Sequence, residues 1–289
     1  MGGSMTGTSS RIRIVTDTTA VLPREYLEAH HVENVPQIIL FGEESFQEEY
    51  ELSYADFIRR LRSFEGLPKT AAPPPGLLVE AYRRQLAEAD TILSIHPSTD
   101  VSGTVRSALT AKEESFPDAD IRVLDTRTVG SNLASMVMAA VEWAESGVSA
   151  DEIMRRLQDM IPRGRIYFLV ATLQYLHKGG RIGGAAALVG SVLQIKPILQ
   201  LSNGRVEPLE KIRTHSHALE RLKEMVIEQC PRSPGARLSV MNADEAEAAQ
   251  RLAREFEAKL GFEHVPVYNV GASITTHGGP GILAVGFFA

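Results

Sequence analysis

Four clusters of polar residues in this sequence combine hydroxyl, imidazole or basic side chains with glycine or proline. They contain Thr70 in KTAAPPPG, Ser98, Thr99 and Ser102 in HPSTDVSGT, Arg181 in KGGR, and His277 in THGGPG. Hydroxyl, imidazole and basic side chains can hydrogen-bond the polar part of a ligand. The clusters therefore predict a ligand site, if the fold brings them together.

The same residues could instead form the active site of an enzyme. Ser98 or Ser102 would then be the nucleophile and His277 its base, in acyl or phosphoryl transfer. Such a pair normally needs an acidic group that orients the histidine, and nothing in the sequence supplies one for His277. We keep this enzyme as the alternative and rank it second.

Other catalytic and cofactor motifs are missing from the sequence or incomplete. There is no Gly-x-Ser-x-Gly elbow and no phosphate loop ending in Gly-Lys-Ser/Thr. GPGILA at 279–284 matches the dinucleotide fingerprint, but five residues follow it, too few for the helix and strand that the fingerprint requires. His30-His31 and His215-Ser-His217 lack a third ligand at metal-binding spacing. We predict no metal, no cofactor and no catalytic residue.

Composition narrows the class of protein further. The 289 residues are 44% hydrophobic and 23% charged, as is usual for a globular protein, and the net charge of −6 argues against a nucleic-acid partner. No apolar run reaches roughly 18 residues, so we expect no stable membrane insertion. A single cysteine, Cys230, fits a reducing compartment, and residues 1–10 lack the features of a signal peptide. We expect a cytoplasmic protein whose residues 1–10 are a disordered tail or an expression remnant.

Strand-like and helix-like segments alternate in the first half of the chain. Strands are predicted at 11–16, 35–41, 91–95 and 121–124, and helices at 52–61, 77–86, 103–114 and 131–145. This order is typical of a mostly parallel sheet with helices on both faces, so we predict an N-terminal α/β domain over residues 11–160. Ligands of such sheets bind beyond the carboxyl ends of the strands, where Ser98 and Ser102 are expected.

Beyond residue 160 the pattern favours antiparallel strands. Asn203-Gly204 between two apolar runs is a strong hairpin signal. Strands are predicted at 165–170, 197–201, 205–208, 238–240, 264–270 and 282–288, and helices at 182–193, 216–229 and 244–260. We therefore predict a second, mixed α/β domain over residues 161–289, with the ligand in the cleft between the two domains.

In this order, the clusters resemble those of the DegV family of fatty-acid-binding proteins. KTAAPPPG is similar to that family's Thr-Ser-Gln-Pro-Ser-Pro-Gly loop, SIHPSTDVSGT to its Ser-Ser-x-x-Ser-Gly-Thr segment, and THGGPGILAVGF to its C-terminal His-x-Gly-Pro-Gly strand. The segment LQYLHKGGRIGGAAALVGSVLQIKPIL resembles the family nearly throughout. The resemblance spans about residues 12–289, and it implies the two-domain DegV-like fold.

The resemblance also implies roles for individual residues. Thr70 and Ser98 would hydrogen-bond the carboxylate of a long-chain fatty acid, Thr99 could do the same, and His277 would lie beside the head group. Departures from the family include Ala71 and Ala72, which stand where its loop has polar residues, and Val21, Pro97, His215 and His217.

A helix is expected to begin shortly after Thr99, near the same head group. Ser102, Gly103 and Thr104 are expected to open a helix whose unpaired N–H groups favour an anion. Arg181 and Arg213 match basic positions of the family, which implies contact with a partner kinase or with the phosphoryl group. In the bacterial fatty acid kinase system, such a protein carries the acyl chain while a separate kinase subunit phosphorylates the carboxylate.

The hydrophobic effect sets a requirement on the shape of such a site. A tail of about fourteen methylenes offers roughly 11 kcal/mol on full burial, at about 0.8 kcal/mol each. Association takes back several kcal/mol in lost freedom, so tight binding needs nearly the whole tail buried. We therefore expect a long slot, with the small residues at 185–190 as one possible wall.

Overall fold

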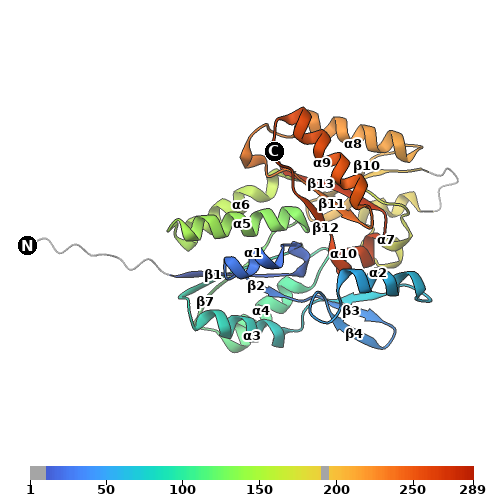
Figure 1. The fold of residues 1–289 in the computed structure, drawn as a ribbon. Coiled ribbons are helices and arrows are strands. Elements are labelled where there is room, and N and C mark those ends of the chain that lie inside the picture. Colours follow the sequence, from blue (N-terminus) through green and yellow to red (C-terminus); the bar gives the residue numbers. More distant parts are fainter. Residues whose placement is uncertain (1–10, 190–194) are drawn as a thin grey trace, which may run out of the picture.

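The computed structural model describes residues 11–189 and 195–289, which form three β-sheets covered by helices (Figure 1). The expected tail at 1–10 and the end of the helix predicted at 182–193 lie outside the described residues. The fold is a mixed α/β fold, with a parallel sheet in the N-terminal half and a mixed sheet in the C-terminal half. The fold class predicted from the sequence is confirmed.

The first sheet is parallel and has the strand order β2-β1-β6-β7. Its strands are β1 (Ile12–Asp17), β2 (Glu33–Val35), β6 (Thr91–His96) and β7 (Asp120–Asp125). One face packs against α1 (Arg24–Ala29), α5 (Ser131–Glu145) and α6 (Ala150–Met160), and the other against α3 (Pro75–Leu86) and α4 (Thr104–Ser115). All six residues of β6 are buried, because helices cover both faces of the sheet.

The segment predicted as one strand at 35–41 is two strands in different sheets. β2 ends at Val35, and β3 (Ile38–Phe41) begins after Pro36-Gln37. Proline has no N–H to give to a strand ladder, and here it marks the point where the chain leaves the parallel sheet. β3 lies in a small antiparallel sheet between β4 (Glu44–Gln47) and β5 (Lys69–Ala71), which packs with α2 (Tyr54–Ser63) and α10 (Gly271–Gly278).

The third sheet has the order β10-β9-β8-β13-β11-β12, antiparallel except for the parallel pair β11–β12. Its strands are β8 (Gly164–Leu169), β9 (Ile198–Ser202), β10 (Arg205–Glu210), β11 (Ser239–Ala243), β12 (Val267–Asn269) and β13 (Ile282–Phe288). α8 (His215–Gln229) and α9 (Ala246–Leu260) cover one face. α7 (Gln174–Lys178) and the 3₁₀ segment η3 (Gly183–Leu188) pack on the other, together with residues of β8 and β13.

Further 3₁₀ turns connect these layers: η1 (Thr18–Ala20), η2 (Ile161–Arg163) and η4 (Pro234–Ala236). The predicted hairpin between β9 and β10 is confirmed, with Asn203 and Gly204 at φ of 49° and 81°. Within the described part of the helix predicted at 182–193, Gly183–Leu188 form the 3₁₀ helix η3 and not an α-helix.

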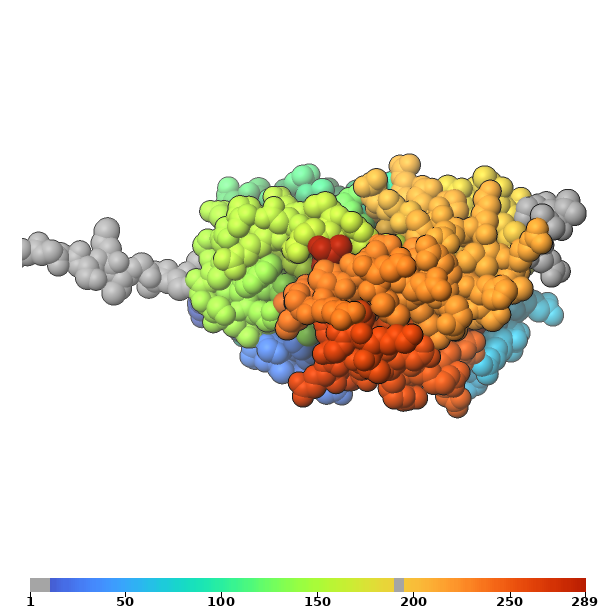
Figure 2. Space-filling view, turned by 90° about the horizontal axis from the view of Figure 1, so that it is seen from above, coloured from blue at the N-terminus to red at the C-terminus, as the bar shows by residue number. Residues whose placement is uncertain are grey.

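The C-terminal end is held in place by its neighbours. β13 lies between β8 and β11 in the middle of its sheet, and the backbone N–H of Ala289 donates to the carbonyl of Arg163 at 2.9 Å. Figure 2 shows this end, in dark red, at the surface between the green segment around α5 and α6 and the orange segment that follows α8. The last strand therefore links the mixed sheet to the layer that covers the parallel sheet.

Candidate functional site

A cavity lies between the carboxyl ends of the parallel strands and the face of the mixed sheet that is turned away from α8 and α9. Its empty space, counted together with the solvent at its opening, is about 1000 Å³. Apolar side chains from the mixed sheet form much of its wall: Ile166, Phe168, Leu201, Met241, Ile282 and Ala284. Polar side chains reach it from the loops of the parallel sheet and from α10.

Thr70 and His277 meet at this cavity although they are far apart in the sequence. Thr70 lies on β5, His277 lies near the end of α10, and Thr70 Oγ1 is 2.7 Å from His277 Nε2. Nδ1 of His277 is buried without a hydrogen-bond partner among the described residues, and it packs so closely on Gly179 that an added Cβ would be 2.5 Å away. The predicted meeting of Thr70 and His277 is present in the fold.

The surroundings of His277 decide its charge and its tautomer. Burial, and then the charge of Arg181, lower its pKa from 6.5 to about 4, so the ring is neutral at neutral pH. A proton on Nδ1 would be a buried donor without an acceptor, which favours the tautomer with the proton on Nε2. Nε2–H then donates to Thr70 Oγ1, and the hydroxyl proton of Thr70 is left to donate to something else.

Arg181 brings a positive charge to the cavity wall. Its Nε donates to the carbonyl of Val101 at 3.1 Å and its Nη1 to the carbonyl of Gly179 at 2.8 Å. Both acceptors are neutral, and no carboxylate of the described residues forms an ion pair with it. The guanidinium is therefore fixed in direction, while no described residue supplies a counter-charge within ion-pair distance.

Ser102 and Gly103 line the cavity at the start of α4, as the sequence predicted for this helix. Ser102 Oγ lies 2.8 Å from Thr104 Oγ1 and accepts the backbone N–H of Thr104 at 3.3 Å. Gly103 packs against Ala72, whose Cβ would be 3.4 Å from a Cβ added to the glycine. Ala72 also lines the cavity, so one of the two alanines singled out in the sequence analysis faces it.

Ser98 and Thr99 belong to the same loop but do not line the cavity. Ser98 is fully buried and donates to the carbonyl of Gly204 at 3.0 Å, and Thr99 donates to Asp125 Oδ2 at 2.7 Å. An added Cβ on Gly204 would be 2.2 Å from Ser98 Oγ, so the β9–β10 turn is seated directly on this loop. A head-group role for Ser98 and Thr99 stays a prediction, while the geometry points to a contact between the two halves of the chain.

That contact is reinforced by charged side chains. Asp100 forms ion pairs with Arg127 at 2.5 Å and with Arg205 at 2.8 Å, and Arg127 also donates to the carbonyl of Asn203. Pro97, Val101, Leu201 and Val206, which flank these residues in the sequence, line the cavity. The contact therefore closes one side of the cavity.

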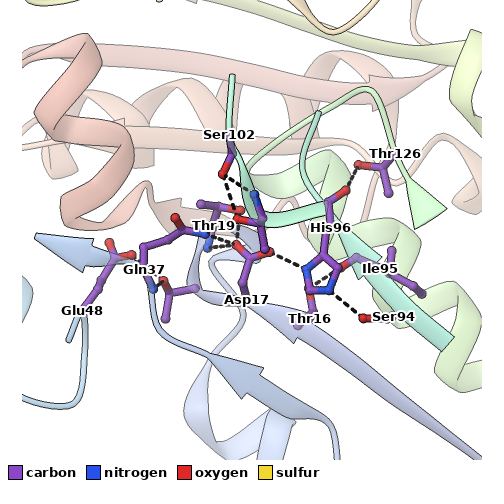
Figure 3. Close-up of polar contacts among 12 residues, drawn as sticks. Thr16, Asp17, Thr19, Gln37, Glu48, Ser94, Ile95, His96, Ser102 and Thr126 are labelled. Atoms are coloured by element: carbon purple, nitrogen blue, oxygen red, sulfur yellow. Dashed lines mark hydrogen bonds and ion pairs between the residues drawn. The ribbon is translucent and has the colours of Figure 1, made fainter. Parts of the chain in front are cut away.

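Several polar groups at the cavity were not among the predicted site residues. Thr19, Gln37 and Ser273 line it. The buried carboxyl of Asp17 accepts hydrogen bonds from Thr19 and Gln37 (Figure 3), and the buried carboxyl of Glu48 accepts from the N–H of Ser273. The polar turn after β1 was visible in the sequence, whereas Gln37 and Ser273 stand in segments without a recognisable motif. Arg213, by contrast, is exposed before α8 and does not line the cavity.

Glu48 connects α10 to the N-terminal half. Its Oε1 accepts the backbone N–H of Ser273 at 2.7 Å, and its Oε2 accepts the hydroxyl of Thr18. Burial raises its pKa to about 7, and these hydrogen bonds offset part of that rise. Glu48 thus titrates near neutral pH at the start of the helix that carries His277.

Within 11–189 and 195–289, no group of three or more His, Cys, Asp or Glu side chains is arranged to hold a metal ion. Among the helices of those same ranges, none is both long and apolar enough to cross a bilayer.

Comparison with known proteins places the chain in a family. The model of the DegV family, described as uncharacterised proteins, matches residues 11–289. A DegV domain-containing protein of Streptomyces coelicolor is 38% identical over 280 residues, which cover 96% of this chain and 98% of that protein.

Two solved structures share the fold. One, described as fatty acid binding of a DegV family protein from Thermus thermophilus, has 32% identity and a TM-score of 0.88 over 96% of this chain and 99% of that one. The other, DegV, a fatty acid binding protein from Bacillus subtilis, has 35% identity and a TM-score of 0.86 over 97% and 100%. By its sequence from residue 11 to residue 289 and by its fold, this chain belongs to the DegV family.

Proposed function

We propose that this protein binds one long-chain fatty acid in the cavity, with the tail along the mixed sheet and the carboxylate at Thr70, Ser102, His277 and Arg181. The observation that carries the proposal is the unbalanced charge of Arg181 beside two hydroxyl groups at a largely apolar cavity. The two DegV structures described as fatty acid binding support the same ligand class.

The polar groups match what a desolvated carboxylate needs. Burying a carboxylate costs several kcal/mol unless hydrogen-bond donors or an opposite charge compensate it. This cost is of the same order as the free energy gained by burying several methylenes of the tail. Thr70 and Ser102 supply hydroxyl donors, and Arg181 supplies the opposite charge. Because His277 is neutral, its part is to occupy the oxygen of Thr70 so that the hydroxyl proton faces the ligand.

We further propose that the bound carboxylate is presented to a separate fatty acid kinase. An Asp–His–Ser chain does exist here, formed by Asp17, His96 and Ser94, but all three residues are fully buried and none lines the cavity. His277 is hydrogen-bonded to Thr70 and not to Ser98 or Ser102. These contacts favour a carrier over the alternative enzyme, because a serine nucleophile needs a base within hydrogen-bond reach.

Native mass spectrometry of the purified protein tests the proposed ligand. We expect the protein to carry one acyl chain, or to take up one equivalent of palmitate or oleate after delipidation. A protein that is empty and takes up neither acid would overturn the proposal.

Incubation with a fatty acid kinase and ATP then tests the partner. Arg213→Ala is expected to keep palmitate bound and to lower acyl phosphate formation.

Binding is also expected to raise the pKa of His277. In the unliganded protein burial and Arg181 hold it at about 4, whereas a bound carboxylate brings an opposite charge that favours the protonated ring. A pH titration of the histidine Cε1–H signals by NMR, with and without palmitate, would measure the change. His277→Gln assigns the signal, and an unchanged titration would place the carboxylate elsewhere.

A further inference from the structure

A chain of hydrogen bonds runs from the buried Asp17 to Ser102 at the cavity wall (Figure 3). Asp17 Oδ1 accepts from the backbone N–H and hydroxyl of Thr19 at 3.1 and 2.6 Å and from Gln37 Nε2 at 3.0 Å. Its Oδ2 lies 2.7 Å from His96 Nδ1. A carboxylate only accepts hydrogen bonds, so Asp17 fixes the direction of every bond that it makes.

The first consequence concerns the amide of Gln37. Its nitrogen must face Asp17, because the amide oxygen cannot donate. The second hydrogen of Nε2 is then left for Thr104 Oγ1, 2.9 Å away. Thr104 therefore accepts at its hydroxyl oxygen, and its own hydroxyl proton is left for its other neighbour, Ser102.

The second consequence concerns Ser102. Its Oγ receives the hydroxyl proton of Thr104 at 2.8 Å and the backbone N–H of Thr104 at 3.3 Å. A hydroxyl oxygen has two lone pairs, so both are used. The proton of Ser102 points away from these two donors, and Ser102, unlike Thr104, lines the cavity.

We propose that Asp17, Gln37 and Thr104 are positioning residues that hold the Ser102 hydroxyl as a donor toward the cavity and so select a head group that only accepts hydrogen bonds. This inference rests on the proposed function and deepens it by naming the origin of head-group selectivity. When the hydroxyl of Ser102 turns and no longer donates, an alcohol head group can donate to Ser102 Oγ instead of accepting from it. A carboxylate can only accept, so it loses the hydrogen bond.

The test is Thr104→Val, which removes the hydroxyl, keeps the side-chain shape and leaves the cavity lining intact. We measure the affinity of delipidated protein for palmitate and for hexadecanol by calorimetry. Palmitate binding is expected to weaken about three- to tenfold, from the loss of a fixed rotamer and of cooperative polarisation. Hexadecanol binding is expected to change by less than about twofold, since its hydroxyl adapts to either direction.

Two variants serve as controls. Thr104→Ser keeps the hydroxyl and should restore the palmitate-to-hexadecanol affinity ratio. Thr126→Val removes another buried threonine hydroxyl, which donates to the carbonyl of His96 at 2.8 Å outside the chain to Ser102, and it should leave that ratio unchanged. If Thr104→Val does not fold, Thr104→Ala removes the same hydroxyl and likewise leaves the cavity lining unchanged.

The outcomes separate the inference from the proposed function. An unchanged ratio in Thr104→Val, or an equal loss of both ligands, overturns the inference while the wild type still binds palmitate. A wild type that binds hexadecanol but not palmitate overturns both. A lowered ratio that Thr104→Ser restores supports the chain from Asp17 to Ser102.

Discussion

Replacing Thr70 with valine and Ser102 with alanine in one variant is expected to weaken palmitate binding by about a hundredfold or more. A hydrogen bond to a charged group contributes about 1.5–3 kcal/mol, so two lost donors cost at least about 3 kcal/mol. Thr70→Val keeps the branched shape on β5, and Ser102→Ala is small, so the apolar wall is preserved. Calorimetric titration of the delipidated variant with palmitate measures the change.

The matched control is Ser98→Ala combined with Thr99→Val. These two hydroxyls come from the same loop as Ser102, but they bond to Gly204 and Asp125 instead of facing the cavity. We expect palmitate affinity within about threefold of the wild type, because no bond to the charged head group is lost. If this control loses the lipid while the Thr70 and Ser102 variant keeps it, the head group lies at Ser98 and our assignment is wrong.

The loop from Ser98 to Ser102 shows what sequence reasoning could not decide. The backbone N–H groups of Val101 and Ser102 both donate to the carbonyl of Ser98, at 3.1 and 3.0 Å, so the loop winds through a turn. Ser98 faces the β9–β10 hairpin as a result, and Ser102 faces the cavity. Both serines precede the same helix, and their directions depend on a hairpin about a hundred residues away, which no local pattern encodes.

Local periodicity was sufficient for the elements that are buried on regular faces. The parallel sheet and its helices could be predicted because apolar spacing and caps are local, as in the Ser149 cap of α6. The small antiparallel sheet could not, since β5 has three residues and α10 begins within a glycine-containing segment. Thr70 and His277 lie on these two elements, so their meeting depended on tertiary packing. The domain boundary at residue 160 stays a prediction.

Glu48→Gln is expected to stabilise the protein above neutral pH and to have little effect in acid. The carboxyl of Glu48 is fully buried, and its pKa is raised from 4.5 to about 7, chiefly by burial. Well below pH 4.5 the group is protonated in both the folded and the unfolded chain. As pH rises toward 7, the unfolded chain loses this proton first, so the folded state loses about 3 kcal/mol relative to it. Glutamine carries no charge at any pH, and it can still accept from the N–H of Ser273.

The pH dependence of the wild-type stability does not isolate the contribution of Glu48, because the contribution of His277 changes with pH in the opposite direction. Its pKa is lowered to about 4, so its contribution to stability is complete above pH 6.5 and is lost as pH falls toward 4. The two contributions overlap between pH 4.5 and 6.5 and oppose each other there. The difference between Glu48→Gln and the wild type removes His277 from the comparison, since both proteins contain it.

Urea denaturation at pH 5, 6, 7 and 8 measures this difference. The midpoint and slope of each transition give the free energy of unfolding. We expect Glu48→Gln to exceed the wild type in free energy of unfolding by about 2–3 kcal/mol at pH 8 and by under about 1 kcal/mol at pH 5. Glu43→Gln, on the exposed turn before β4, controls for the loss of one negative charge and should give a difference near zero throughout. A difference for Glu48→Gln that is the same at all four pH values would mean that the pKa of Glu48 is the same in the folded and the unfolded protein. In that case burial does not raise the pKa of Glu48, and the backbone N–H of Ser273 on α10 donates to a charged carboxylate at neutral pH.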